Sequence, residues 1–246
     1  EFGYIEIQDV TSQFGAFAIA GPNSKELIIS MINDKNPSEL FSNENFPWLS
    51  SKSIELGMTP ALAIRVAYTG ELGWELHYPV EFQNKLLEMI LNSGRDFDLK
   101  LVGSRAQNWL RQEKSYRAFG NELGRDASLV ESGLEKFMDM KKEFLGKTAL
   151  NKHKSNSKCV TLLIDGPKDC DPWGREAIFK GVETVGRLTS GGYSVVFDKS
   201  IGLGYIRKEL ANVGEKVGIK MLNKIWPAII VEDSPYDPEN LKLKNR

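Results

Sequence analysis

The sequence predicts an α+β protein in which a mixed strand–helix domain is followed by a small C-terminal antiparallel β-barrel. In the first part of the chain, β-type runs alternate with helical patterns. From Lys158 onward, short β-rich runs are separated by Gly, Asp and Asn turns, a spacing typical of sandwiches and barrels. We therefore assign residues 1–152 to the first domain and residues 153–246 to the barrel, with the polar stretch 151–158 as the link.

The first domain is predicted to begin with a strand and a helix. Residues 14–20 form an apolar run typical of a buried strand, and residues 21–24 lead into a helix of about ten residues that ends near Asn33. Residues 34–53 are expected to form a loop, because two prolines interrupt regular structure there.

A hairpin is predicted over residues 61–79, with a tight turn at Thr69 and Gly70. In its second arm the side chains alternate in character, so one face is apolar and the other is polar. The apolar positions are Trp74, Leu76 and Tyr78, and the polar ones include Glu75 and His77. Glu75 is therefore expected on a rigid element, as a hydrogen-bonding site requires.

Two helices are predicted after the hairpin. The first begins at Pro79 and ends at Gly94, with an apolar stripe on one side. The second follows Ser104, which together with Gln107 fits a capping box. The strands of the barrel are then expected at 159–164, 182–189, 193–197, 202–206, 216–222 and 225–231.

Composition limits the partners that the chain can have. Of its 246 residues, 41% are hydrophobic and 26% are charged, as in ordinary globular proteins. The net charge of −1 gives no electrostatic argument for a nucleic acid or an anionic membrane as a partner. No run of about 18 apolar residues is present. Residues 1–5 contain no initiator Met and no signal pattern, so we expect a fragment, or a chain that has lost an upstream segment.

No metal site and no flavin site are expected from the sequence. Cys159 and Cys170 do not have the spacing of zinc ligands, and the chain contains two histidines. Both cysteines are expected to be reduced thiols. Gly202 and Gly204 lack the third glycine and the strand–helix context of a dinucleotide site, so we expect no FAD site.

Several short segments have the sequence motifs of one family. Residues 68–75 have the form Tyr-x-Gly-Glu-x-Gly-x-Glu, and residues 113–120 are Glu-Lys-Ser-Tyr-Arg-Ala-Phe-Gly. Residues 188–193 are Leu-Thr-Ser-Gly-Gly-Tyr, and residues 199–205 are Lys-Ser-Ile-Gly-Leu-Gly-Tyr. In this order they resemble the aminomethyltransferase family, which includes the glycine-cleavage T-protein. The second block is most similar to the C-terminal folate-binding parts of dimethylglycine and sarcosine dehydrogenases.

The resemblance implies that the first domain binds folate and that Tyr68, Glu75 and Arg105 contribute to the site. A pterin ring presents a ring N–H beside an exocyclic amine, and a carboxylate accepts such a pair of donors as it accepts a guanidinium. By the resemblance that carboxylate is Glu75, and Tyr68 would offer its hydroxyl or its ring face. The alternatives are a solvated Glu75 and a Tyr68 that only packs in the strand.

Arg105 would face the glutamate tail of the folate. In the T-protein this arginine belongs to an Ala-Arg-Asp triplet, whereas here residues 104–106 are Ser-Arg-Ala and the Asp is absent. Arg111 and Arg117 are alternatives for the same role. No catalytic residue is assigned, because the Asp that the family uses belongs to an upstream segment.

The implied function is tetrahydrofolate-dependent transfer of an aminomethyl or methylene unit. The chain would act as the C-terminal part of a dimethylglycine or sarcosine dehydrogenase-like protein, or of an aminomethyltransferase. Expected partners are a small-molecule amine and an upstream segment or flavoprotein domain or subunit, in the bacterial cytoplasm or the mitochondrial matrix. Two alternatives are a non-catalytic folate-binding or scaffold module and a folate-dependent demethylase that acts on another methyl donor.

Overall fold

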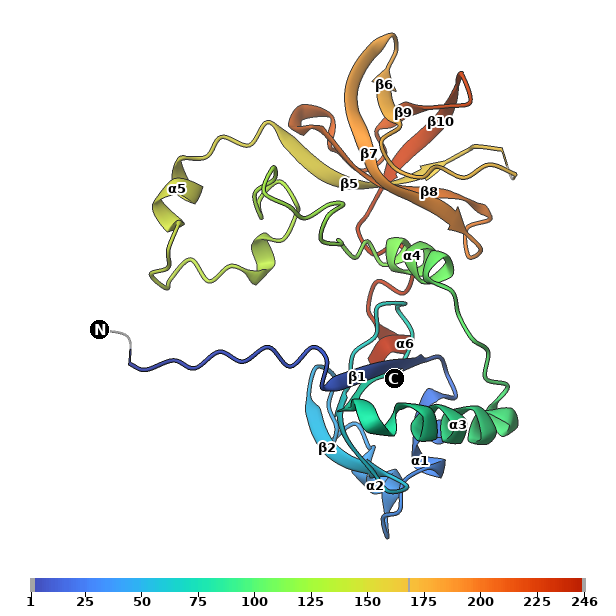
Figure 1. The fold of residues 1–246 in the computed structure, drawn as a ribbon. Helices are drawn as coiled ribbons and strands as arrows, with labels where there is room; N and C mark the ends of the chain where they lie inside the picture. The colour runs from blue at the N-terminus through green and yellow to red at the C-terminus, as the bar shows by residue number, and fades with distance from the viewer. Residues whose placement is uncertain (1–2, 168, 245–246) are drawn as a thin grey trace. The chain divides into compact units, whose positions relative to one another are not determined.

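The computed structural model describes residues 3–167 and 169–244, and it divides the chain into two compact units (Figure 1). Unit 1 comprises residues 1–102 and 239–246, and unit 2 comprises residues 103–238. A mixed strand–helix unit and a unit with a closed antiparallel barrel confirm the predicted α+β class. The boundary near residue 152 concerns domains along the sequence and stays a prediction. No helix in the described part of the chain is long and apolar enough to cross a bilayer.

Unit 1 is built on a four-stranded antiparallel sheet with the strand order β1-β4-β3-β2. Its strands are β1 (Phe14–Ala20), β2 (Ser51–Leu56), β3 (Thr59–Ile64) and β4 (Gly73–Pro79). As the alternation predicts, Trp74, Leu76 and Tyr78 of β4 are at most 1% exposed. They lie in the core of the unit, whereas Glu75 and His77 remain partly exposed on the opposite face.

Helices complete unit 1. They are α1 (Ser24–Ser30), α2 (Pro37–Leu40), α3 (Gln83–Ser93) and α6 (Leu241–Lys244), with 3₁₀ turns η1 (Val80–Phe82) and η2 (Gly94–Phe97). The helix predicted to end near Asn33 is shorter and ends at Ser30. The region expected as a loop at 34–53 also contains α2 and the start of β2.

The predicted hairpin exists, but its tight turn is wrong. β3 and β4 pair from Leu62 with His77 to Ile64 with Glu75, and β3 ends there. β4 begins only at Gly73, and beyond Ile64 the backbone N–H of Arg65 donates to the carbonyl of Ser50 on the β2 side. The side chain of Arg65 is 2% exposed and donates to the carbonyls of Phe46 and Lys244, while its buried Nε has no partner among the described residues. The chain between β3 and β4 is therefore a connection that buries a cation, and not a tight turn.

Unit 2 contains a closed six-stranded antiparallel barrel in the order β10-β5-β8-β7-β6-β9. The strands are β5 (Ser157–Ile164), β6 (Ala177–Lys180), β7 (Glu183–Ser194), β8 (Lys199–Arg207), β9 (Lys216–Met221) and β10 (Lys224–Val231). β6 was not predicted, and β7 is one strand where two runs were expected. The helices and 3₁₀ turns of unit 2 are α4 (Ser104–Glu113), η3 (Glu135–Phe137), α5 (Lys147–Lys152) and η4 (Lys208–Leu210).

Helix α4 packs on β7, and the capping box predicted at its start is wrong. Gly103 is the N-cap in an extended conformation, and Ser104 is already the first helical residue. The helix lies so close to the barrel that a Cβ on Gly192 would meet Trp109 at 2.1 Å. Glycine at this position therefore permits the contact between the indole and the strand.

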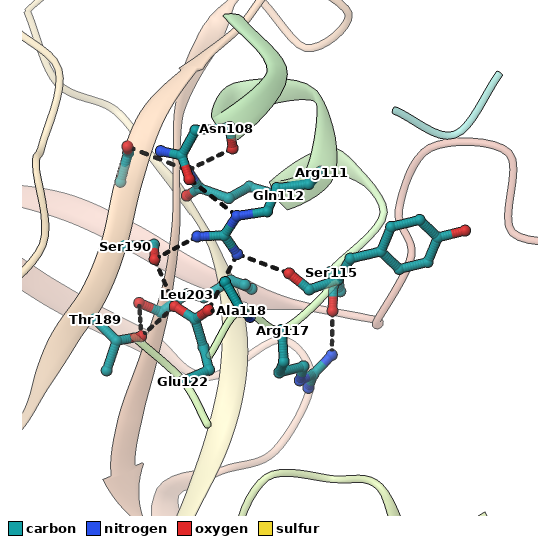
Figure 2. Close-up of polar contacts among 12 residues, drawn as sticks. Asn108, Arg111, Gln112, Ser115, Arg117, Ala118, Glu122, Thr189, Ser190 and Leu203 are labelled. Carbon is teal, nitrogen blue, oxygen red and sulfur yellow. Dashed lines mark hydrogen bonds and ion pairs between the residues drawn. The ribbon is translucent and has the colours of Figure 1, made fainter. Parts of the chain in front are cut away.

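A buried ion pair fixes α4 to the barrel (Figure 2). Arg111 of α4 and Glu122 are 1% and 0% exposed, and Arg111 Nη1 lies 3.0 Å from Glu122 Oε2. Arg111 also donates to Asn108 Oδ1, to the Tyr116 carbonyl and to the hydroxyl of Ser190 in β7. The guanidinium thereby links the helix, the turn that follows it and the strand.

Glu122 is satisfied from three directions. Its Oε2 accepts the backbone N–H of Ala118 at 2.9 Å, and its Oε1 accepts the hydroxyls of Thr189 at 2.7 Å and Ser190 at 2.5 Å. Removing one partner from such a buried pair leaves an uncompensated charge, whereas replacing both by apolar groups does not.

We therefore expect Glu122→Gln to lower the free energy of unfolding by about 3 to 5 kcal/mol, measured by chemical denaturation of the whole chain. The double variant Arg111→Met/Glu122→Leu should lose clearly less than either single variant. As a control, Glu183→Gln removes the exposed partner of Arg207 and should leave the free energy of unfolding nearly unchanged. An equal loss in the free energy of unfolding for Glu122→Gln and Glu183→Gln would contradict a stabilising role of the buried pair.

A second carboxylate organises the chain before β5. Glu131 Oε2 accepts the backbone N–H and the hydroxyl of Ser128 and lies 3.2 Å from His153 Nε2, while Oε1 accepts the hydroxyl of Ser157. Burial works to raise the pKa of this carboxyl, but the hydrogen bonds from Ser128, His153 and Ser157 outweigh burial and lower the pKa.

Because the folded-state pKa of Glu131 is lowered, its contribution to stability is present above the unfolded-state pKa and disappears as the pH falls through the folded-state pKa. We expect Glu131→Gln to reduce the free energy of unfolding at pH 7 by about 1.5 to 3 kcal/mol. The difference from wild type should shrink as the pH falls below about 4.5. A difference that is constant down to the acid transition would rule out this linkage.

Candidate functional site

Glu75 lies on an inner strand of the sheet in unit 1, where its position is fixed on both sides. In β4 it is paired with Ala18 of β1 and with Ile64 of β3. Its side chain is 43% exposed on the open face of the sheet. A carboxylate on this backbone has little freedom to move and yet remains accessible, as the sequence predicts.

His77 is the next residue of β4 on the same face, and its Nε2 lies 3.3 Å from Glu75 Oε2. The imidazole therefore contacts one carboxylate oxygen of Glu75. The sequence places His77 on this face but does not indicate the contact, because the alternation of a strand identifies faces and not rotamers.

An open cavity of about 810 Å³ extends along this face of the sheet. The described residues that line it include His77 but not Glu75, and several are apolar. They come from the segment before β1, from the start of β1, from the region after α1 and from β3 and β4: Val10, Phe14, Ile32, Leu40, Pro60, Leu62, Ile64 and Pro79. The volume falls in the usual range for small-molecule sites, about 300 to 1,000 Å³.

Tyr68 lies in the connection between β3 and β4 and is 36% exposed. Next to it, Thr69 Oγ1 is buried and has no hydrogen-bond partner among the described residues. An unsatisfied buried hydroxyl costs about 1 to 3 kcal/mol, which a bound water or ligand group would recover. Gly70 has φ +82°, a conformation that a glycine adopts without strain.

Arg105 belongs to unit 2, where α4 presents it to an acidic and aromatic cluster. Its Nη2 lies 2.9 and 3.1 Å from the two carboxylate oxygens of Asp171. Its guanidinium carbon lies 5.2 Å from the ring centre of Trp109 and 5.4 Å from that of Trp173. The side chain is 56% exposed, so the charge stays accessible although it is paired.

The two alternatives to Arg105 are both engaged inside unit 2. Arg111 forms the buried pair with Glu122, as described above. The side chain of Arg117 is 6% exposed, donates to the carbonyls of Ser115 and Ser132, and pairs with Asp233 at 2.7 Å. Neither cation is available to a ligand, which leaves Arg105 as the accessible arginine of the three.

The predicted site residues thus fall into two groups. In unit 1, Glu75 lies on β4 and Tyr68 lies on the connection that precedes β4. Arg105 lies on α4 in unit 2. Their assignment to a single folate site stays a prediction. Asp171 and Trp173 are neighbours that sequence reasoning did not find, since Asp171 is 66 positions away from Arg105.

Two family models match the chain, one in each half. The sequence model of the GCVT N-terminal domain matches residues 2–142, and that of the glycine cleavage T-protein C-terminal barrel domain matches residues 158–237. The chain belongs to the glycine-cleavage T-protein (aminomethyltransferase) family. The resemblance seen in the sequence is confirmed.

Relatives include both branches of this family. Mitochondrial dimethylglycine dehydrogenase of Homo sapiens is 37% identical over 239 residues, which cover 94% of this chain and 27% of the relative. An aminomethyltransferase of Caldanaerobacter subterraneus subsp. tengcongensis is 31% identical over 94% of this chain and 61% of its own length. The chain therefore spans about a quarter of the dehydrogenase and three-fifths of the transferase.

A solved structure shows the same fold. The crystal structure of glycine cleavage system aminomethyltransferase T from Bartonella henselae superimposes with a TM-score of 0.77 and 21% sequence identity. The superposition covers 92% of this chain and 60% of that protein.

Cys159 of β5 is a thiol that takes no part in either group. It is 2% exposed, and burial, only partly opposed by the charge of Arg117, raises its pKa to about 12. A thiol that is both buried and protonated is unreactive, because the thiolate is the nucleophile.

We expect Cys159 to resist a disulfide reagent in the native protein, while the half-buried Cys170 reacts. At pH 8 about one thiol equivalent should be labelled quickly, and the second should react at least about a hundredfold more slowly unless the protein is unfolded. In Cys170→Ser the fast phase should vanish. Rapid labelling of that variant would show that Cys159 is accessible.

Proposed function

We propose that this chain is the tetrahydrofolate-binding part of an enzyme that transfers a one-carbon unit, as an aminomethyl or methylene group. The observation that carries the proposal is Glu75, an accessible carboxylate on an inner strand within the Tyr-x-Gly-Glu-x-Gly-x-Glu segment of the family. A rigid carboxylate suits the paired donors of a pterin ring, because both of its oxygens can accept hydrogen bonds.

The residues present are compatible with such a ligand. Glu75 keeps acceptor capacity beyond its one contact with His77, and the unsatisfied hydroxyl of Thr69 lies beside Tyr68 in the sequence. Tetrahydrofolate, when bound, supplies the nitrogen that accepts the one-carbon unit. The chain would contribute orientation: Glu75 holds the pterin, Tyr68 contacts it, and Arg105 pairs with a carboxylate of the glutamate tail. Holding reactants in place is itself a large part of catalysis.

The source of the one-carbon unit is part of the same proposal. Relatives are named dimethylglycine dehydrogenase and sarcosine dehydrogenase, which favours a small N-methylated amine as the donor and a flavoprotein domain or subunit as the partner. Their names also favour the mitochondrial matrix, whereas the bacterial transferases favour the cytoplasm. The second candidate is a module that binds folate without catalysing transfer.

We expect Glu75→Gln to weaken the binding of 5-formyltetrahydrofolate by about 1.5 to 3 kcal/mol, or about 10- to 150-fold, because a hydrogen bond to a charged acceptor is lost. Calorimetric titration of the folded variant measures this change. As a matched control, Glu88→Gln removes an exposed carboxylate of α3 that does not line this cavity and should leave the affinity within about twofold. Unchanged affinity in Glu75→Gln would remove this residue from the site.

Transfer is tested separately from binding. The protein is incubated with tetrahydrofolate, dimethylglycine and the relevant flavoprotein partner, and formation of 5,10-methylenetetrahydrofolate is followed. Methylene formation that requires the chain and falls in Glu75→Gln is expected. Folate binding without any acceleration of this reaction would favour the non-catalytic module.

A further inference from the structure

Arg105 pairs with Asp171 in a geometry that does not use the full capacity of a guanidinium. Both carboxylate oxygens contact the same nitrogen, Nη2, at 2.9 and 3.1 Å. The strongest arginine–carboxylate pairs form two parallel bonds from two nitrogens of the planar fork. A carboxylate that is free to orient itself can form this two-nitrogen pair, whereas Asp171 is tied to its own backbone.

The surroundings keep the guanidinium in place for such an exchange. The rings of Trp109 and Trp173 both lie within 6 Å of it, the range of a cation–π interaction. Trp109 is itself fixed, because it packs against the backbone at Gly192. The position of Arg105 is therefore maintained by aromatic contacts that do not depend on which carboxylate it binds.

Space for a second carboxylate lies beside the pair. A small open cavity of about 150 Å³ is lined by Arg105, Asp171 and both indoles, together with Asn108, Pro172 and Gly191. A carboxylate with its adjoining carbon atoms fits this volume, and 80% exposure of Trp173 leaves the cavity reachable from solvent.

We infer that Asp171 is an internal competitor that occupies Arg105 until an external carboxylate displaces it. The inference rests on the proposed function, and its ligand class is a carboxylate on an aromatic amide, such as the benzoylglutamate part of a folate. The displacing carboxylate takes the two-nitrogen geometry, and Asp171 returns to water. Asp171 thus sets how tightly the tail binds without contacting the pterin.

The test uses N-(4-aminobenzoyl)glutamate, a probe with the tail and no pterin, in ligand-observed NMR titrations of the whole chain. Asp171→Asn should bind the probe about three- to tenfold more tightly than wild type. In an Arg105→Ala background the same substitution should have no effect. Asp165→Asn is the matched control, because it removes a carboxylate from an exposed pair with Lys199 elsewhere in unit 2 and should change nothing. 4-Aminobenzamide, which has no carboxylate, should not distinguish the variants.

Affinity for the probe that is unchanged or weaker in Asp171→Asn would overturn the inference, since Asp171 would then be a structural partner or a positioning residue. The outcome is separable from that of the proposed function. If Glu75→Gln leaves the affinity for 5-formyltetrahydrofolate unchanged while Asp171→Asn still tightens probe binding, the pterin assignment fails and the exchange at Arg105 stands. The reverse pattern overturns the exchange alone.

Discussion

The buried pair of Arg111 and Glu122 is the interaction on which the organisation of unit 2 depends (Figure 2). Neither charge could be buried alone, since the desolvation cost of an unpaired ion exceeds the stability of a typical domain. Each is therefore surrounded by partners from α4, from the turn before Glu122 and from β7. Since these partners come from distant parts of the sequence, the pair defines one arrangement of the helix on the barrel and disfavours others.

Helix α4 carries two arginines whose surroundings are very different. Arg105 and Arg111 are six positions apart, which at 3.6 residues per turn places them on different sides of the helix. Arg111 is 1% exposed and bound internally, whereas Arg105 is 56% exposed and lies between two indoles. The buried arginine ties the helix to the barrel, and the helix in turn fixes where the accessible arginine emerges.

Local sequence patterns predicted the faces of the strands better than the ends of the elements. The alternation from Trp74 to Tyr78 was enough to separate the core from the open face, because a strand repeats every two residues. After the end of β3, Arg65 buries its side chain and bonds to carbonyls at Phe46 and Lys244. No local pattern reports a contact between residues so far apart. β6 was not predicted because its four residues are too few for an alternation of apolar and polar side chains to be recognised. Its place in the barrel is set by pairing with β7 and β9.

The same distinction separates the two groups of predicted site residues. The Tyr68–Glu75 segment could be found because its motif is contiguous and its carboxylate lies on a strand whose faces are legible in the sequence. The environment of Arg105 could not be predicted from the sequence, because Asp171 and Trp173 contact it from a loop far along the chain. The sequence could therefore propose Arg105 as the binding cation, but its contact with Asp171 becomes visible only when the chain is folded. Under the proposed exchange, affinity is a difference between two pairings of one guanidinium, so a ligand contact contributes only its excess over the contact with Asp171.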